Sequence, residues 1–151
     1  MKFRGILTLI GKVSDGTVGG ARGHRIILSE AAAKEALAGL VGLSINFTTS
    51  ADGHDILNKC GEISGAEIVD AELRICGLMS RDCPSVIAAL LARPDDFGMS
   101  YEMEAVRIAC IRSEVWTITK TSFTGAAILL KSAAAYRETS FKLDGPAGVR
   151  A

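Results

Sequence analysis

The sequence predicts a β-rich α+β domain whose sheet forms a closed or nearly closed β-barrel flanked by two or three helices. Many short apolar or alternating segments are bounded by turn residues, whereas only two segments have the pattern of a helix. Strands also follow strands without a helix between residues 60 and 79 and between 97 and 130. A parallel sheet of βαβ units needs a helix after each strand, so this arrangement favours the barrel.

Size and charge limit the classes of function. A chain of 151 residues is long enough for one core, and we expect one domain over residues 1–142 with a flexible tail over 143–151. The 17 basic and 17 acidic residues cancel, which argues against nucleic acid or an anionic membrane as a partner. No apolar run reaches the length of a membrane helix, and Thr8 and Gly11 interrupt the apolar start too early for a signal peptide.

The first part of the chain predicts a strand, a loop, a strand and a helix. Residues 3–13 are predicted as a strand, followed by a Gly-rich loop that lacks the phosphate-binding pattern. A short strand, His24–Leu28, leads to a helix over Glu30–Leu40. Ser29 has the side chain of an N-cap for this helix.

The middle of the chain predicts three strands and the second helix. Residues 43–48 alternate between apolar and polar, as a half-buried strand does, and 60–69 and 71–79 form a predicted hairpin. Pro84 opens a helix at a position where its missing N–H costs nothing, and residues 93–96 end it.

The last part predicts three more strands and a short helix. Residues 97–112 form the longest candidate strand, which we expect to be bent or bulged. Residues 114–119 and 122–130 are predicted as separate strands, and 131–139 as a short helix.

The four cysteines predict neither a metal site nor a redox motif. Cys60, Cys76, Cys83 and Cys110 include no C-x-x-C pair, and two histidines are too few for a zinc cluster. We expect reduced thiols in a cytosolic compartment, most of them buried as small apolar side chains. No cofactor and no metal ion are implied.

A histidine and a serine are the candidate catalytic residues. His54 follows the loop residues Asp52 and Gly53, and Ser100 lies near the start of the long strand over 97–112. A histidine close to a serine can accept the hydroxyl proton while the oxygen attacks a carbonyl carbon. Strand periodicity puts Ser100, Glu102 and Glu104 on one face of that strand.

Seven short segments, in this order, carry a resemblance to a known family. They are Leu40-Val41-Gly42, Gly53-His54-Asp55, Lys59-Cys60-Gly61-Glu62-Ile63, Ile75-Cys76-Gly77, Asp82-Cys83-Pro84, Gly98-Met99-Ser100-Tyr101-Glu102, and Ser122 to Leu129 with Ala133 to Tyr136. Over about residues 24–140 the chain resembles tailed-phage proteins related to prohead maturation proteases. That group is similar in fold to herpesvirus assembly proteases.

The resemblance implies a function and its setting. In such proteases the histidine of an His-Asp pair is the general base and a serine after a glycine is the nucleophile, roles that fall on His54 and Ser100. The implied substrates are scaffold and major capsid protein segments, cleaved in the immature capsid within the cytoplasm of a bacterial host. A homodimer is also implied, and the tail over 143–151 is a candidate for self-cleavage.

The chain departs from the family pattern at the third catalytic position. Such proteases carry an acid or a second histidine on a strand after the serine, and here Lys120 is expected near that place. A lysine only donates hydrogen bonds, so it cannot orient an imidazolium. Asp55, Glu102 and Glu104 are the possible substitutes.

Two other hypotheses follow from this departure. The chain can be an inactive family member that serves as a structural capsid or scaffold component, in which case replacing Ser100 changes no processing. It can also be a small β-barrel binding module, which predicts a ligand-sized apolar cavity.

Overall fold

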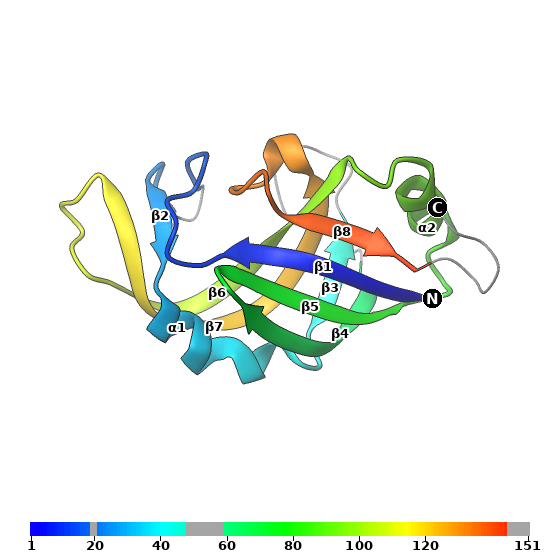
Figure 1. Ribbon diagram of the computed structural model, residues 1–151, viewed down its shortest axis with the longest axis horizontal. Helices are drawn as coiled ribbons and strands as arrows, with labels where there is room; N and C mark the ends of the chain where they lie inside the picture. Colours follow the sequence, from blue (N-terminus) through cyan, green and yellow to red (C-terminus); the bar gives the residue numbers. More distant parts are fainter. Residues whose placement is uncertain (19–20, 48–58, 145–151) are drawn as a thin grey trace.

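The computed structural model describes residues 1–18, 21–47 and 59–144. Over these residues the chain forms one mixed sheet of eight strands that curls around a single apolar core (Figure 1). Short helices lie at the lower left and the right end of the view in Figure 1. The β-rich α+β class predicted from the sequence is therefore confirmed.

The elements and their bounds follow in chain order. They are β1 (Lys2–Leu9), β2 (Arg25–Leu28), α1 (Glu30–Ala36), the 3-10 helix η2 (Leu37–Leu40), β3 (Ser44–Phe47), β4 (Lys59–Val69), β5 (Glu72–Met79), α2 (Pro84–Ala92), β6 (Phe97–Ile108), β7 (Val115–Leu130), the 3-10 helix η3 (Lys131–Ala133) and β8 (Ser140–Leu143).

Strand β7 is the centre of the sheet because it pairs with three other strands. One of its edges carries β6, in an antiparallel ladder that runs from Phe97 opposite Leu130 to Ile108 opposite Ile118. The short strands β2 and β3 pair with it in parallel at two separate stretches. The remaining strands follow from β3 in the order β4, β5, β1 and β8, all antiparallel to their neighbours.

The helices form where the sequence places their caps. The Ser29 hydroxyl accepts a hydrogen bond from the Ala32 backbone N–H at 3.1 Å, and α1 then packs its alanines against β7. Pro84 stands at the first turn of α2, and Val86 and Leu90 of this helix reach the core. Neither helix is long and apolar enough to cross a membrane, among the residues that the structure describes.

The sheet is curled but open, which corrects the prediction of a closed or nearly closed barrel. Within the described residues no ladder joins β6 to β8, the two strands that would have to pair to close it. The residue that precedes β8 contacts β6 instead, because the Thr139 hydroxyl accepts a hydrogen bond from the Met99 backbone N–H at 3.0 Å. Strand β1 packs across the opening against β6, so the core is covered without closure.

Two predictions about the C-terminal third are wrong. The predicted strands 114–119 and 122–130 are one strand of sixteen residues, because the polar stretch around Lys120 continues the ladder to β6. The predicted helix over 131–139 is a single 3-10 turn followed by the strand β8. This strand contains Leu143, and residues 145–151 lie outside the described residues, so the flexible tail remains a prediction.

The cysteines are less buried than the sequence predicted. Cys60 is buried and Cys83 is half-buried, but Cys76 and Cys110 are exposed. All four are free thiols, as expected. Burial raises the pKa of the Cys60 thiol to about 12, whereas the backbone N–H of Arg112 lowers the pKa of Cys110.

We predict that the thiols react in a fixed order with iodoacetamide at about pH 8, because the thiolate is the reactive form. Cys110 reacts first, Cys76 follows, and Cys60 stays unmodified until the protein is unfolded. Peptide mass spectrometry over a time course measures this order. Modification of Cys60 in the native protein at the rate of Cys76 would contradict the burial described here.

We predict that Gly77→Ala destabilises the protein by about 3 kcal/mol or more, through overpacking between β1 and β4. A Cβ atom on Gly77 would lie 2.0 Å from the Glu62 carbonyl oxygen and 2.6 Å from the Phe3 ring. The matched control is Gly39→Ala, because a Cβ atom there meets nothing within 4 Å. Urea unfolding measures both variants, and equal stabilities would contradict the register of β5 between its neighbours.

Candidate functional site

Ser100 lies in a row of side chains that crosses three strands. It is half-buried on β6 and stands opposite Ala127 of β7, which in turn is in register with Asn46 of β3. Laterally paired residues point to the same face of a sheet, so the three side chains share one face. Because the middle residue is an alanine, only a methyl group separates the serine from the asparagine.

Glu102 lies one step along the same face and is held by Asn46. Its carboxylate accepts a hydrogen bond from Asn46 Nδ2 at 3.0 Å. The strand partner of Glu102 is Gly125, and a Cβ atom on that glycine would lie 3.3 Å from Glu102 Oε2. The carboxylate thus occupies the space that a side chain at Gly125 would fill, and it lies on the side of β6 that carries Ser100.

The asparagine is buried to an unusual degree for a polar residue. Only 5% of Asn46 is exposed, and its Oδ1 atom has no hydrogen-bond partner among the described residues. Burying an amide without full hydrogen bonding costs free energy, about 1–3 kcal/mol for an unmatched group. An apolar residue would fit this strand better, so stability alone does not account for the asparagine.

The opposite face of β6 anchors the strand in the core. Met99 is buried, and the Tyr101 ring packs edge-on against Phe123 with ring centroids 5.1 Å apart. The Tyr101 hydroxyl is buried, and this burial raises the pKa of the phenol. These contacts hold the backbone on both sides of Ser100, so the position of the serine is set by packing.

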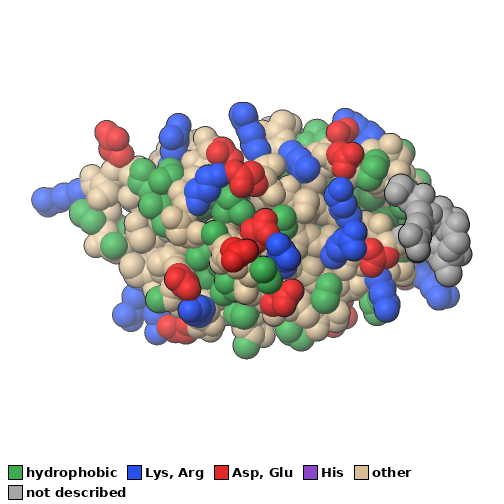
Figure 2. Space-filling model, in the orientation of Figure 1, with side chains coloured by type: hydrophobic (Ala, Val, Ile, Leu, Met, Phe, Trp, Pro, Cys, Tyr) green, Lys and Arg blue, Asp and Glu red, His purple; other side chains and the backbone are tan. Residues whose placement is uncertain are grey.

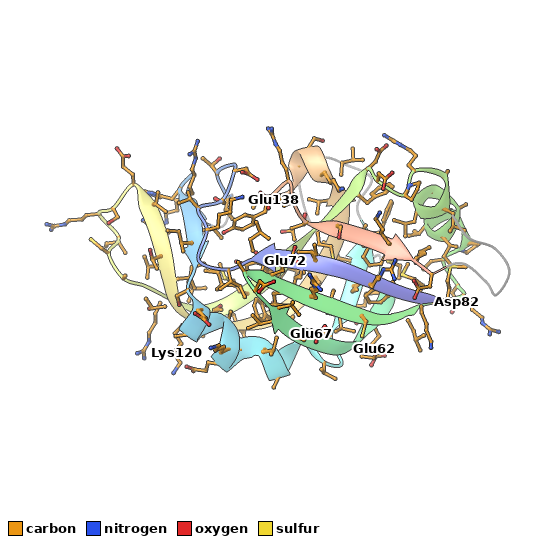
Figure 3. All side chains as sticks on the ribbon, viewed as in Figure 1. Glu62, Glu67, Glu72, Asp82, Lys120 and Glu138 are labelled. Atoms are coloured by element: carbon orange, nitrogen blue, oxygen red, sulfur yellow. The ribbon has the colours of Figure 1, made fainter. Side chains whose placement is uncertain are left out.

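The structure tests the predicted positions of some site residues and leaves those of others untested. His54 and Asp55 lie outside the described residues, so the histidine–serine pair stays a prediction. The expectation that Lys120 lies near Ser100 is wrong, because Lys120 is opposite Arg107 and forms an ion pair with Glu35 of α1 at 3.5 Å (Figure 3). Six residues of β7 lie between Lys120 and Ala127, the partner of Ser100.

Of the two described acids, Glu102 fits the site better than Glu104. Glu104 is exposed and stands opposite Ser122, one step farther from Ser100 along β6. Glu102 is half-buried and fixed by the amide of Asn46.

Sequence reasoning missed Asn46, Gly125 and Ala127 as parts of the site. Asn46 carried no signal, because Ser44 and Asn46 take the polar positions of a strand that alternates between apolar and polar residues. The two small residues of β7 carried no signal of their own. Their role appears only when the register places them between Ser100, Glu102 and Asn46.

Two hollows of several hundred Å³ lie elsewhere on the surface, and neither is lined by Ser100. One, of about 700 Å³, covers the outer face of β4, β5, β1 and β8 and includes Arg4, Arg74 and Cys76. Positive and negative side chains are interspersed over this side of the molecule (Figure 2). The other hollow lies beside α2. No cluster of three metal-ligating side chains occurs among the described residues.

Comparison with known proteins gives one distant similarity. No family model matches the sequence, and no curated protein is significantly similar to it. Among solved structures, the chain is similar to a Kaposi's sarcoma herpesvirus protease in complex with an allosteric inhibitor, with 12% identity and a TM-score of 0.47. The match covers 95% of this chain and 78% of that one. Similarity of this degree assigns no role to any residue of this chain, and the phage family remains an expectation.

We predict that Asn46 and Glu102 are energetically coupled. Asn46→Ala and Glu102→Ala each remove the hydrogen bond, so the double variant should be less destabilised than the sum of the single variants, by about 1–2 kcal/mol. A double-mutant cycle from urea unfolding measures the coupling. The control is a second cycle that combines Asn46→Ala with Glu104→Ala. If the coupling energy of Asn46 with Glu102 equals that of Asn46 with Glu104, the hydrogen bond does not hold Glu102.

Proposed function

We propose that the protein is a serine endopeptidase in which Ser100 is the nucleophile, His54 is the general base and Glu102 orients the base. The observation that carries this proposal is the carboxylate of Glu102, held by a buried asparagine on the face of β6 that carries Ser100. A fixed acid beside a serine is the part of a catalytic triad that the sequence lacked at its expected position.

The proposed reaction is acyl transfer through a covalent intermediate. His54 takes the proton of the Ser100 hydroxyl while the oxygen attacks the carbonyl carbon of a peptide bond. The tetrahedral intermediate collapses when the C–N bond breaks, and the imidazolium gives its proton to the leaving amine. Water, deprotonated by the same imidazole, then releases the acid and restores Ser100.

The part proposed for Glu102 is electrostatic. A carboxylate that accepts from the second ring N–H fixes the tautomer of a histidine and stabilises the imidazolium that forms. An ionised carboxylate accepts about four hydrogen bonds, so the bond from Asn46 is compatible with a second bond from a histidine. The bond also fixes the carboxylate in place, so less reorganisation accompanies each proton transfer.

The substrate is proposed from the family resemblance. We infer cleavage of scaffold segments and coat-protein extensions in an immature phage capsid, inside a bacterial host. The tail over 143–151 is a proposed site of self-cleavage. A C-terminus that stays intact through long incubation of the purified protein would count against self-cleavage.

We predict that a fluorophosphonate probe labels Ser100, because such probes phosphonylate activated serines with loss of fluoride and spare ordinary ones. Ser100→Ala and His54→Ala should lose the label. Ser122→Ala, an exposed serine on β7, should keep it. Peptide mass spectrometry locates the modification, and circular dichroism confirms that each variant is folded.

The same assay tests the acid. Glu102→Gln keeps an oxygen for Asn46 but removes the negative charge, so the labelling rate should fall about 10²–10⁴-fold while the unfolding midpoint changes little. Glu104→Gln is the matched control and should be labelled at the normal rate. An unlabelled wild-type protein would favour the inactive structural component, and a Glu102→Gln variant of full reactivity would remove Glu102 from the site.

A further inference from the structure

Two of the four thiols lie beside each other where β4 begins, although they are far apart in the sequence. The Cys83 thiol donates a hydrogen bond to the Lys59 carbonyl oxygen at 3.5 Å, and that carbonyl belongs to the peptide group that joins Lys59 to Cys60. The carbonyl of Cys60 accepts a hydrogen bond from the Ser80 backbone N–H at 2.8 Å. The connection from β5 to α2 therefore runs along the start of β4 and brings Cys83 to Cys60.

Cys60 is the extra residue of a β-bulge. Two consecutive residues of β3, Ile45 and Asn46, are in register with Gly61 and Lys59 of β4, so Cys60 between them has no partner on β3. A bulge takes a residue out of the regular alternation of a strand and redirects its side chain. Cys60 is completely buried, so solvent does not reach its thiol in the folded protein.

Cys83 packs against the apolar cluster that contains Cys60, and it is half-buried. Burial, and after it a negative charge on Cys83, raise the pKa of the Cys60 thiol to about 12. Cys83 is also the N-cap residue of α2, but its side chain caps no backbone N–H of the helix. Serine, threonine, aspartate and asparagine are the favoured N-cap residues, so capping does not account for a cysteine at this position.

We propose that Cys60 and Cys83 are a redox-active pair that forms a reversible disulfide bond with a small disulfide, such as oxidised glutathione, as the oxidant. The spacing of the two cysteines in the sequence gives no sign of such a pair, because only the fold brings them together. This inference is independent of the proposed peptidase activity.

The proposed reaction is a double thiol–disulfide exchange. The Cys83 thiolate attacks one sulfur of oxidised glutathione, whose S–S bond breaks and releases one glutathione thiolate. The Cys60 thiolate then attacks Cys83 Sγ, and the mixed disulfide breaks and releases the second glutathione. Two protein thiols are oxidised, one glutathione disulfide is reduced to two thiols, and the two protons of the protein thiols pass to the released glutathione.

The other two thiols lack a neighbouring thiol of this kind. Cys76 is exposed, and its partners in register are Gly65 of β4 and Arg4 of β1. Cys110 is exposed in the connection between β6 and β7. Both can therefore keep a bound glutathione, whereas a glutathione on Cys83 is displaced by Cys60.

The bond would anchor α2 to the sheet. Val86 and Leu90 are the two buried residues of this nine-residue helix, so few side chains hold it. A disulfide between Cys60 and Cys83 ties the start of the helix to the start of β4 and also restricts the unfolded chain. Oxidation should therefore stabilise the fold, and a reducing compartment should leave the pair as two thiols.

Incubation of the folded full chain in glutathione redox buffers of increasing oxidising strength tests the proposal. The free thiols are then blocked in urea and the protein is digested without a reducing agent. Trypsin leaves each cysteine on a peptide of its own, namely residues 60–74, 75–81, 82–107 and 108–112. Mass spectrometry should find the peptides of Cys60 and Cys83 joined by a disulfide, and those of Cys76 and Cys110 carrying glutathione.

Cys83→Ser is the informative variant, because a serine hydroxyl can still donate a hydrogen bond to the Lys59 carbonyl. It should leave Cys60 a free thiol in every redox buffer, whereas the matched control Cys110→Ser should keep the bond between Cys60 and Cys83. Oxidation should raise the urea midpoint of the wild-type protein by about 1–2 M and leave that of Cys83→Ser unchanged.

Three results would overturn the proposal. The first is a Cys60 that stays a free thiol while Cys76 and Cys110 carry glutathione. The second is a Cys83 that keeps its glutathione instead of passing to the bond with Cys60. The third is a bond between Cys60 and Cys83 that forms only in urea, because it would show that the folded chain does not bring the two thiols together.

Discussion

The structure depends on β7, the strand to which β6, β2 and β3 are all hydrogen-bonded. A strand that is paired along one edge by β6 and along the other by two short parallel strands must be free of bulky side chains where its neighbours reach across it. Gly125, Ala126 and Ala127 meet this requirement, and all three are buried. The small residues let the long side chains of β6 and β3 meet above the strand, which is how Glu102 comes to accept a hydrogen bond from Asn46.

The polar pair on this face is costly for the fold, which is the reason to read it as functional. Asn46 is almost completely buried and its carbonyl oxygen is unmatched among the described residues. Buried polar groups without a full set of hydrogen bonds lower the stability of the fold. Their presence therefore calls for another explanation, such as a function. The inner face of β6 compensates, because Met99 and Tyr101 anchor the strand in the core while Ser100 and Glu102 stay on the outer face.

Most elements could be predicted from the sequence alone. Helix α1 follows from Ser29, helix α2 from Pro84, and the β4–β5 hairpin from two consecutive strand-like segments, because these signals are local. The single strand β7 was missed because Lys120 and its polar neighbours resemble a loop, although they pair with β6. The open sheet was missed as well, since closure depends on whether β6 and β8 meet, and no local pattern encodes a contact between residues so far apart.

The site shows the same division between local and long-range information. The nucleophile role of Ser100 rests on the family resemblance and stays a prediction. The choice among the acids could not be made, because it depends on the register between β6 and β7 and on the position of β3. One bulge fewer in that ladder would have changed which residue of β7 faces Ser100.

The most direct test of this account is a crystal structure of the protein after reaction with a fluorophosphonate. The account predicts a phosphorus–oxygen bond to Ser100 Oγ, with the His54 ring between Ser100 and the carboxylate of Glu102, and Glu102 still bonded to Asn46. A probe attached to another residue, or a His54 ring on the opposite side of β6, would contradict it.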